Sequence, residues 1–473
     1  MDLLSITEDF IQFKNDNCLK ENNYFEGNIY AEKVEQIRKE TIYIKIFNEE
    51  PILFLPRKLV YLDCSKNKLN SLPDLPGNLV YLYCHFNNLK SLPDLPDNLV
   101  NLNCSQNYLE TLPELPKNLL NLDCSKNNLK SLPELPDNLE NLTCGSNKLT
   151  LPDLPKSLEH LDCSYSNLET LPELPKNLLN LDCSENNLKS LPDLPDNLKE
   201  LICFENNLTT LPELPKNLLK LDCYQNILET LPELPKKLLK LDCIDNKLET
   251  LPDLPKRLKF LNCSENKLKF LPELPDSLEY LDCSNNKLKS LSELPKNLIK
   301  IDCSENKLKS LPELPDNLKN LQCSKNMLIF LPELPDNLRY LDCFHNKIET
   351  LPVFPKRLFD LYCSNNNLKT LPDLPDNLDL LNCSQNYLET LPKLPDNLLN
   401  LDCSKNMLKS LPELPKRLQF LNCSENELET FPELPKNLLE LKIFKNMLKS
   451  LPKLTDKFIN LNCSQFIEML QKK

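Results

Sequence analysis

The sequence predicts a solenoid, a fold in which short and nearly identical turns of chain stack into an elongated array. Two observations carry this prediction. An LxCxxN pattern recurs every 20 residues in almost all turns from Cys64 to Cys463, with one slip of a single residue between Cys144 and Cys163. This recurrence gives 21 turns, and apolar residues hold the same offsets in all of them. Such a unit buries its hydrophobic edge only against its neighbours, so the array needs one continuous core. Length alone suggests about three domains, but the unbroken register argues for a single array.

Each turn is expected to hold one short strand, one tight turn and one extended return segment. A representative turn carries its apolar and proline positions in the order Leu119, Leu122, Cys124, Leu129, Leu132, Pro133, Leu135 and Pro136. The alternation around the cysteine predicts a strand, and identical successive turns place these strands in a parallel sheet on the concave face. The LPxLP segment is too short and too rich in proline for a helix, so the convex face is expected to be extended polyproline II.

An asparagine stands three residues after the cysteine position in 19 of the 21 turns. Buried amide side chains in register can bond the backbone groups that a tight turn leaves unpaired, so we expect an asparagine ladder inside the solenoid. The two exceptions are Ser166, which follows the short turn, and Phe466, in the last turn. The short turn predicts a local kink, and Phe466 marks the end of the ladder.

Both ends of the array are expected to carry caps that cover the exposed edge strands. Residues 42–465 form the repeat array, and residues 42–56 of it form a degenerate first turn marked by Ile44 and Ile52. Residues 1–41 form an N-terminal cap with two short predicted helices, Leu3–Phe13 and Ala31–Glu40. Residues 466–473 form a short C-terminal cap, which leaves no room for a catalytic or effector domain.

Composition argues against several classes of function. The chain has 69 acidic and 56 basic residues and a net charge of −13, which disfavours nucleic acid as a partner. No apolar run approaches membrane-spanning length, and residues 1–17 lack the features of a secretory signal. Twenty of the 21 cysteines occupy the repeat position, where they act as small buried hydrophobic residues. We therefore predict an intracellular protein, cytoplasmic or in host cytoplasm, in a reducing compartment.

The LPxLPxxLxxLxCxxNxLxx unit resembles the short bacterial-type leucine-rich repeats of the IpaH and YopM effector families, and similar arrays occur in giant viruses and some protists. This resemblance implies a leucine-rich repeat solenoid over residues 42–465. IpaH-like proteins carry a separate ubiquitin-ligase domain after their repeats, whereas this chain stops at Lys473. YopM-like proteins, which are mostly repeats behind a helical cap and act as scaffolds, match better. The repeated cysteine in place of an aliphatic residue, together with the scarcity of alanine, looks more like a giant-virus or protist member.

The concave face is the predicted site of partner binding. Positions three and one before the cysteine, and one and two after it, are expected to face this side. Aspartate precedes the cysteine in ten turns and serine usually follows it. This rule breaks in a set of apolar and charged residues that we call the central patch: Ile202, Phe204, Lys220, Tyr224, Lys240, Ile244, Phe260 and Tyr280. Exposed aromatic residues amid charges are typical of a binding hot spot.

Two further aromatic clusters are visible in the sequence. One contains Arg339, Tyr340, Phe344, His345, Phe359 and Tyr362, and the other contains Tyr61, Tyr81, Tyr83, His85 and Phe86. Drift of a repeat array also scatters aromatic residues, and contacts within an oligomer would use them too. These two readings of the central patch stay open at this stage.

No residue set in the sequence predicts catalysis, a metal or a cofactor. His160, Asp162 and Ser164 have the residue types of a hydrolase triad, but neighbours on one strand face are about 6.6 Å apart and no oxyanion hole is apparent. The aspartates that precede the cysteine form a row, the aspartate file, which reads as a solvated acidic face. It is not expected to bind Ca²⁺, because that ion needs about six to eight oxygen ligands in a bent loop. The cysteines lack the spacing of a metal site, and Cys18 reads as a cap residue.

The sequence therefore predicts a non-enzymatic leucine-rich repeat scaffold that binds a protein on its concave face, with self-association as a further option. Two alternatives remain. The array is the substrate-recognition arm of a ubiquitin ligase whose catalytic subunit is a separate chain, or it is a structural component of a particle.

Overall fold

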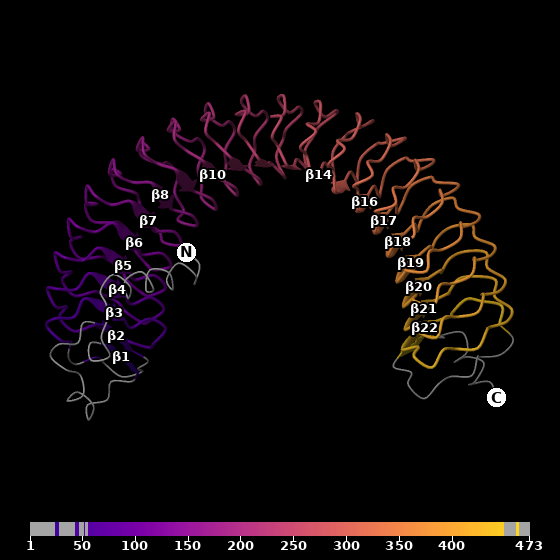
Figure 1. Cartoon of the computed structure of the whole chain (residues 1–473), viewed down its shortest axis with the longest axis horizontal. Helices are drawn as coiled ribbons and strands as arrows, with labels where there is room; N and C mark the ends of the chain where they lie inside the picture. The colour runs from indigo at the N-terminus through magenta and orange to yellow at the C-terminus, as the bar shows by residue number, and fades with distance from the viewer. Residues whose placement is uncertain (1–23, 28–42, 47–51, 53–54, 449–459, 463–473) are drawn as a thin grey trace. The chain divides into compact units, whose positions relative to one another are not determined.

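The computed structural model describes residues 24–27, 43–46, 52, 55–448 and 460–462. It divides into two units, Met1–Ile227 and Leu228–Lys473, which are described separately. Within each unit the chain winds in stacked turns, with one short strand per turn on the inner side and the return segments on the outer side (Figure 1). The chain is thus a leucine-rich repeat solenoid, as predicted.

All strands run parallel to their neighbours within each unit, and equivalent residues of successive turns are paired, as Leu201 is with Leu221. The strands of the first unit are β1 (Tyr24–Gly27), β2 (Tyr43–Ile46), β3 (Tyr61–Asp63), β4 (Tyr81–Tyr83), β5 (Asn101–Asn103), β6 (Asn121–Asp123), β7 (Asn141–Thr143), β8 (His160–Asp162), β9 (Asn180–Asp182), β10 (Glu200–Ile202) and β11 (Lys220–Asp222). Those of the second unit are β12 (Lys240–Asp242), β13 (Phe260–Asn262), β14 (Tyr280–Asp282), β15 (Lys300–Asp302), β16 (Asn320–Gln322), β17 (Tyr340–Asp342), β18 (Asp360–Tyr362), β19 (Leu380–Asn382), β20 (Asn400–Asp402), β21 (Phe420–Asn422), β22 (Glu440–Lys442) and β23 (Asn460–Asn462).

The core of each turn consists of the predicted leucines and the cysteine. In the representative turn Leu119, Cys124 and Leu129 are fully buried, and Leu122 is 2% exposed. Each fully buried leucine stabilises the fold by about 1.5–3 kcal/mol. The return segments contain neither helix nor strand in the described residues, which fits an extended chain. Their polyproline II conformation stays a prediction.

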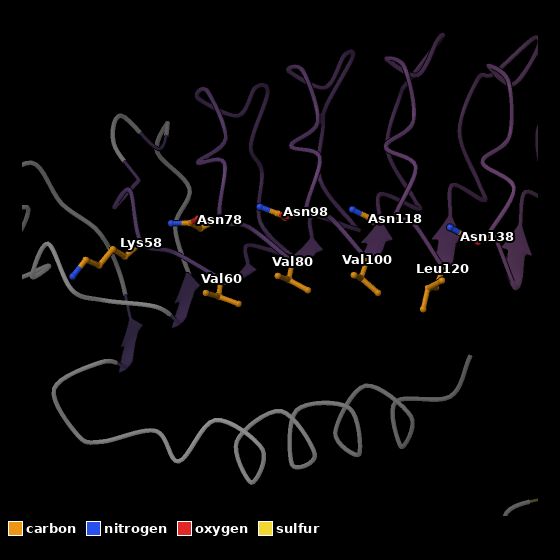
Figure 2. A pocket seen from close by; sticks show the side chains of 9 residues that line it. All are labelled: Lys58, Val60, Asn78, Val80, Asn98, Val100, Asn118, Leu120 and Asn138. Carbon is orange, nitrogen blue, oxygen red and sulfur yellow. The ribbon is translucent and has the colours of Figure 1, made fainter.

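A row of side chains stands directly before the strands, four residues ahead of each cysteine position. In the first turns this row is apolar and half-buried, and its members are Val60, Val80, Val100 and Leu120 (Figure 2). Backbone bonds hold the row in register, because the amide of each residue donates to the carbonyl of the one before it, at 2.8 Å for Val80 to Val60 and 2.9 Å for Val100 to Val80.

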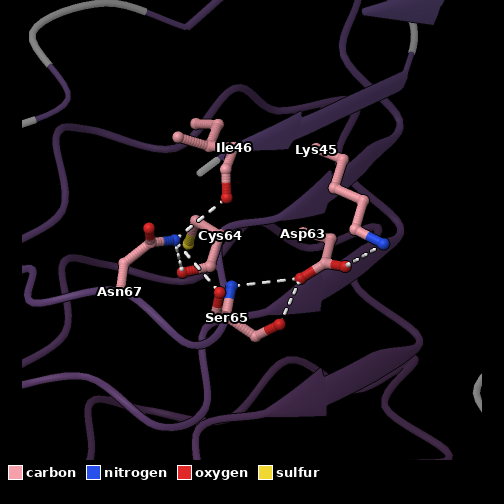
Figure 3. Close-up of polar contacts among 6 residues, drawn as sticks. All are labelled: Lys45, Ile46, Asp63, Cys64, Ser65 and Asn67. Atoms are coloured by element: carbon pink, nitrogen blue, oxygen red, sulfur yellow. Dashed lines mark hydrogen bonds and ion pairs between the residues drawn. The ribbon is translucent and has the colours of Figure 1, made fainter. Parts of the chain in front are cut away.

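The predicted asparagine ladder is present inside the solenoid, and we call it the inner ladder. The amide nitrogen of Asn67 donates to the carbonyls of Ile46, Cys64 and Ser65 at 3.0, 2.9 and 3.0 Å (Figure 3). Deeper in the array, the carbonyl oxygen of the asparagine is used as well: Asn87 Oδ1 accepts the amide of Leu69 at 3.0 Å. Each such asparagine therefore satisfies carbonyls of two successive turns and one amide of the preceding turn.

The ladder closes a strained turn. The residue two positions after the cysteine has a positive φ throughout the described array, for example 58° at Lys66, 53° at Lys126 and 50° at Asp245. Few of these residues are of the types that favour this conformation, which costs a residue with a side chain roughly 1–2 kcal/mol. The amide of this residue donates to the next turn, as Lys66 does to His85 at 2.9 Å. The bonds between turns thus offset the strain of each turn.

A second asparagine ladder, which the sequence analysis missed, lies at the surface, in the turn before each strand. We call it the exposed asparagine ladder. Asn118 Nδ2 donates to the carbonyl of Asp97 at 2.9 Å, and Asn317 Nδ2 donates to that of Lys296 at 3.0 Å. The asparagine stands six residues before the cysteine in these turns and reaches back 21 residues. It ties successive turns together at the tight turn that leads into each strand.

The short turn between Cys144 and Cys163 keeps its strand register, because His160 pairs with Asn141 and Asp162 with Thr143. The missing residue is absorbed in the return segment, where Thr150 forms an isolated bridge with Ser131. The adjustment predicted as a kink therefore lies outside the sheet. Ser166 replaces the ladder asparagine here, and its amide donates to Asn186 Oδ1 of the next turn at 3.0 Å.

Of the two predicted caps, the structure describes only residues 24–27. Tyr24–Gly27 forms β1, which pairs with β2, so the region expected to be a partly helical cap contains a strand. The predicted helices Leu3–Phe13 and Ala31–Glu40 and the C-terminal cap 466–473 lie outside the described residues. In the degenerate first turn, Ile44 and Ile46 of β2 are fully buried, and Ile44 pairs with Leu62.

The cysteines are core residues. The nineteen cysteines of the described array, from Cys64 to Cys423, are free thiols and are all fully buried. Burial raises the pKa of thiols such as Cys183, Cys323 and Cys403, because the thiolate would be poorly solvated there. Ile443 takes this position in a later turn and is 1% exposed, so the site accepts an aliphatic side chain equally well.

Loss of one ladder asparagine should destabilise the array strongly. In Asn326→Ala the buried amide of Leu308 loses its acceptor, and the carbonyls of Cys303 and Cys323 each lose one of two asparagine donors, so we expect a loss of roughly 2–4 kcal/mol in urea denaturation. The matched control is Asn317→Ala in the exposed ladder, with an expected loss under about 1 kcal/mol. Equal losses in the two variants would contradict the role given to the inner ladder.

The buried thiols should make the protein sensitive to alkali. Because the folded thiols have raised pKa values, the unfolded chain binds fewer protons above its own thiol pKa of about 8.5, and the free energy of unfolding falls as pH rises. At pH 9.5 each such thiol costs about 1.4 kcal/mol, so circular dichroism should show unfolding between pH 8.5 and 10. Replacing Cys303, Cys323 and Cys343 with valine should shift the midpoint to higher pH. Stability that stays constant up to pH 10 would refute this account.

Candidate functional site on the concave face

The strand positions three and one before the cysteine are half-buried in most turns, while the leucine or isoleucine between them is buried, as in β15 and β20. These two positions, with the residue one after the cysteine, form three files of side chains along the concave face. The files run at right angles to the strands, so a residue contacts its equivalents in the neighbouring turns.

The aspartate file has a structural role. Ser65 donates both its amide and its hydroxyl to Asp63 Oδ1, at 3.0 and 2.6 Å (Figure 3). The same clamp recurs where asparagine replaces aspartate, as between Ser264 and Asn262. The prediction of a simply solvated acidic face was therefore wrong: these side chains hold the end of each strand. Burial raises the pKa of Asp182 and Asp302, although the bonds from the following serine oppose this effect.

Ser164 belongs to the same clamp. Its hydroxyl donates to Asp162 Oδ1 at 2.7 Å, and His160 is exposed at the other end of the strand. In the described residues no cluster of histidine, cysteine, aspartate or glutamate has the arrangement of a metal site. The described part of the chain also contains no helix with the length and hydropathy needed to cross a membrane.

In the first unit, the structure brings together two aromatic residues of the central patch. The rings of Phe204 and Tyr224 stack with centroids 4.2 Å apart and an angle of 7° between their planes. Lys220 lies 3.5 Å from Asp222 and forms an ion pair with it. Both rings sit in the file where most turns have serine, so they replace the hydroxyl of the clamp with an apolar surface.

Ile202, the remaining member in this unit, borders a hollow in the concave face. This hollow has a volume of about 290 Å³ and is lined on its acidic side by Asp162, Asp182 and Glu200. It lies over β7 to β10. The hollow was not predicted, because sequence spacing does not show where a file of side chains leaves space.

In the second unit, Phe260 and Tyr280 stack with centroids 4.4 Å apart and an angle of 7° between their planes. Lysines cover both ends of this pair: Lys240 Nζ lies 5.0 Å from the Phe260 centroid, and Lys300 Nζ lies 5.1 Å from that of Tyr280. We call these four residues the aromatic ladder. Lys240 also pairs with Asp242 at 3.8 Å. Lys300 was missed by the sequence analysis, although it stands in the same file 20 residues after Tyr280.

The central patch is less exposed than predicted. Phe204, Tyr224, Ile244, Phe260 and Tyr280 are all half-buried, because rings one turn apart cover each other's faces. Burial, with a contribution from Asp282, raises the pKa of Tyr280 to about 12. Each ring is thus packed against its neighbour in the next turn and stays partly accessible.

The other two clusters differ from each other. In the cluster near residue 340, Tyr340 and Tyr362 are 5.6 Å apart in a tilted arrangement, and Phe359 is 49% exposed. In the cluster near the N-terminus, Tyr61 and Tyr83 are only 2% and 4% exposed. Tyr61 and Tyr83 are therefore part of a buried core, whereas Phe86 of the same cluster is 56% exposed.

The comparisons with known proteins agree with this geometry. Residues 256–296 match a family described as Leucine Rich repeats (2 copies). A comparison with curated proteins finds no match. Among solved structures, YopM from Yersinia enterocolitica is 36% identical, with a TM-score of 0.81, over 98% of this chain and 100% of that one. YopM from Yersinia pestis, described as a leucine-rich effector protein, is 39% identical, with a TM-score of 0.58, over 63% of this chain and 86% of that one.

A plant peptide hormone receptor, RGFR1 in complex with RGF2, is 22% identical with a TM-score of 0.59, over 94% of this chain and 92% of that one, and shares the fold alone. The likeness to the Yersinia enterocolitica protein is of a different order, because it extends over both chains at more than a third identity. The chain therefore belongs to the YopM-like family of leucine-rich repeat proteins.

Proposed function

We propose that this protein is a non-enzymatic scaffold whose concave face binds a protein partner. The observation that carries the proposal is the aromatic ladder, in which Phe260 and Tyr280 are stacked between two lysines on the open side of the sheet. Aromatic side chains supply much of the binding energy in protein interfaces, and they do so best when surrounded by polar groups.

The stacking prepares the rings for binding. A ring that is already held by its neighbours loses little conformational entropy when a partner covers it, so more of the contact energy appears as affinity. In the first unit, the Phe204–Tyr224 pair has the same geometry. The acidic hollow beside Ile202 suits a cationic side chain of a partner.

Three further observations support the proposal. The Yersinia pestis relative is described as an effector protein, and this chain shares the family with it. The net charge of −13 favours a partner with a basic surface, because opposite charges speed association. The buried thiols of the array fit a reducing, intracellular compartment.

The test begins with capture of the partner by the full chain from lysate under reducing conditions, followed by titration of the purified partner. We expect Phe260→Ala/Tyr280→Ala to weaken binding about 30-fold or more, corresponding to about 2 kcal/mol. Phe204→Ala/Tyr224→Ala tests the first unit in the same way. The matched control is Phe420→Ala, which removes a ring from the same file as Phe260, where Lys442 lies 5.1 Å from the ring centroid.

Circular dichroism should first show that all variants fold. Unchanged affinity in both double variants would refute the concave site. Capture of a ubiquitin-ligase catalytic subunit would identify the chain as a recognition arm of such an enzyme, and self-association as the sole result would favour a structural component of a particle.

A further inference from the structure

An apolar groove runs along the first turns of the solenoid, beside the strands. Its floor is the row of Val60, Val80, Val100 and Leu120, and one wall is the exposed asparagine ladder, with the side chains of both rows visible in Figure 2. The groove has a volume of about 820 Å³. It lies entirely within the first unit.

The longest unbroken apolar run of this row ends at Leu120, and apolar residues recur in later turns only singly or in pairs such as Leu219 and Leu239. The next two residues in the row are Glu140 and Glu159, both exposed, so the groove ends where the floor becomes charged. Four successive half-buried aliphatic residues in a file that carries charges in many later turns form a bounded surface of the kind that marks a contact site.

The concave face next to the groove is buried in the first two of these turns. Tyr43, Tyr61 and Tyr83 are 2%, 2% and 4% exposed and form one cluster, against which Val60 and Tyr81 pack. Tyr280 and Tyr340 occupy the same strand position as Tyr61 in later turns and are only half-buried. Burial of the face and the apolar floor thus overlap in the turns of β3 and β4, close to the end of the solenoid that carries β1.

The sequence before β1 contains a segment with matching properties. Residues 3–13 have apolar side chains at the spacing of one helix face, namely Leu3, Leu4, Ile6, Phe10, Ile11 and Phe13. As a helix this segment would be about 15 Å long, and four strands in parallel register span about 14 Å. Ten residues separate it from Tyr24, a reach of up to about 33 Å, and β1 is only two strands away from β3.

We propose that residues 3–13 form an amphipathic helix that occupies this groove, so that the chain carries its own ligand for the first turns. Its apolar face contacts Val60, Val80, Val100 and Leu120, and its polar face, with Glu8 and Asp9, remains in solvent. A tethered segment has an effective concentration in the millimolar range, which favours it over a second copy or a foreign helix. The helix thereby reserves the later turns of the concave face for partners.

Hydrogen–deuterium exchange of the full chain tests this assignment. We expect amides of residues 3–13 in the wild type to exchange at least tenfold more slowly than an unstructured peptide of that sequence. Val100→Asp should abolish this protection, because a carboxylate in the floor repels the apolar face. The matched control is Leu239→Asp, a half-buried residue in the same row of a later turn, which should leave the protection intact.

Phe10→Asp provides an independent variant, since it lies in the segment and leaves the floor of the groove unchanged. It should also abolish protection of residues 3–13 while the exchange of residues 160–448 stays at the wild-type rate. Fast exchange of residues 3–13 in the wild type, or protection that survives both variants, would overturn the proposal. Protection that appears only at concentrations where the protein is a dimer would also overturn it and would identify a second copy as the occupant.

Discussion

The fold depends on one interaction, the bonding of buried asparagine amides to the backbone of successive turns. A turn of only 20 residues must reverse direction sharply after its strand, and it does so through a residue with positive φ such as Lys126. This reversal leaves carbonyls pointing into the core, where water cannot reach them. Asn127 bonds two of these carbonyls, of Cys104 and Cys124, and accepts the amide of Leu109. Without that side chain, the close packing of leucines would enclose unpaired polar groups, which is costly.

The sequence was sufficient for the solenoid and for the inner ladder, because a buried amide at a fixed position has few partners other than the local backbone. The sequence did not predict the exposed asparagine ladder, to which Asn118 belongs, or the clamp between Asp63 and Ser65. Polar residues at exposed positions usually face water, so spacing alone gives no reason to assign them a bond. Their partners are set by the direction of nearby carbonyl and amide groups, which only the backbone geometry defines.

The same limit applies to the candidate site. Composition identified Phe260 and Tyr280 as unusual residues in their file, and the period placed them in adjacent turns. It did not show that the separation of two strands matches that of two stacked rings, at 4.4 Å, so that each ring hides part of the other. Exposure was therefore overestimated, and the lysine at the far end, Lys300, was overlooked. Packing between adjacent turns depends on two side chains together, whereas a residue pattern describes one turn at a time.

The bonds of the inner ladder have a direction along the chain. The amide of Leu109 receives its acceptor, and the carbonyl of Cys104 its second donor, from Asn127, a residue of the turn that follows. The amide of Cys104 likewise donates to Asp123, at 2.8 Å. A turn is therefore complete only once its successor is in place. Synthesis proceeds from the N-terminus, so the turn made last always lacks these partners. The nascent array therefore has one incomplete edge, and each new turn completes that edge and forms the next one.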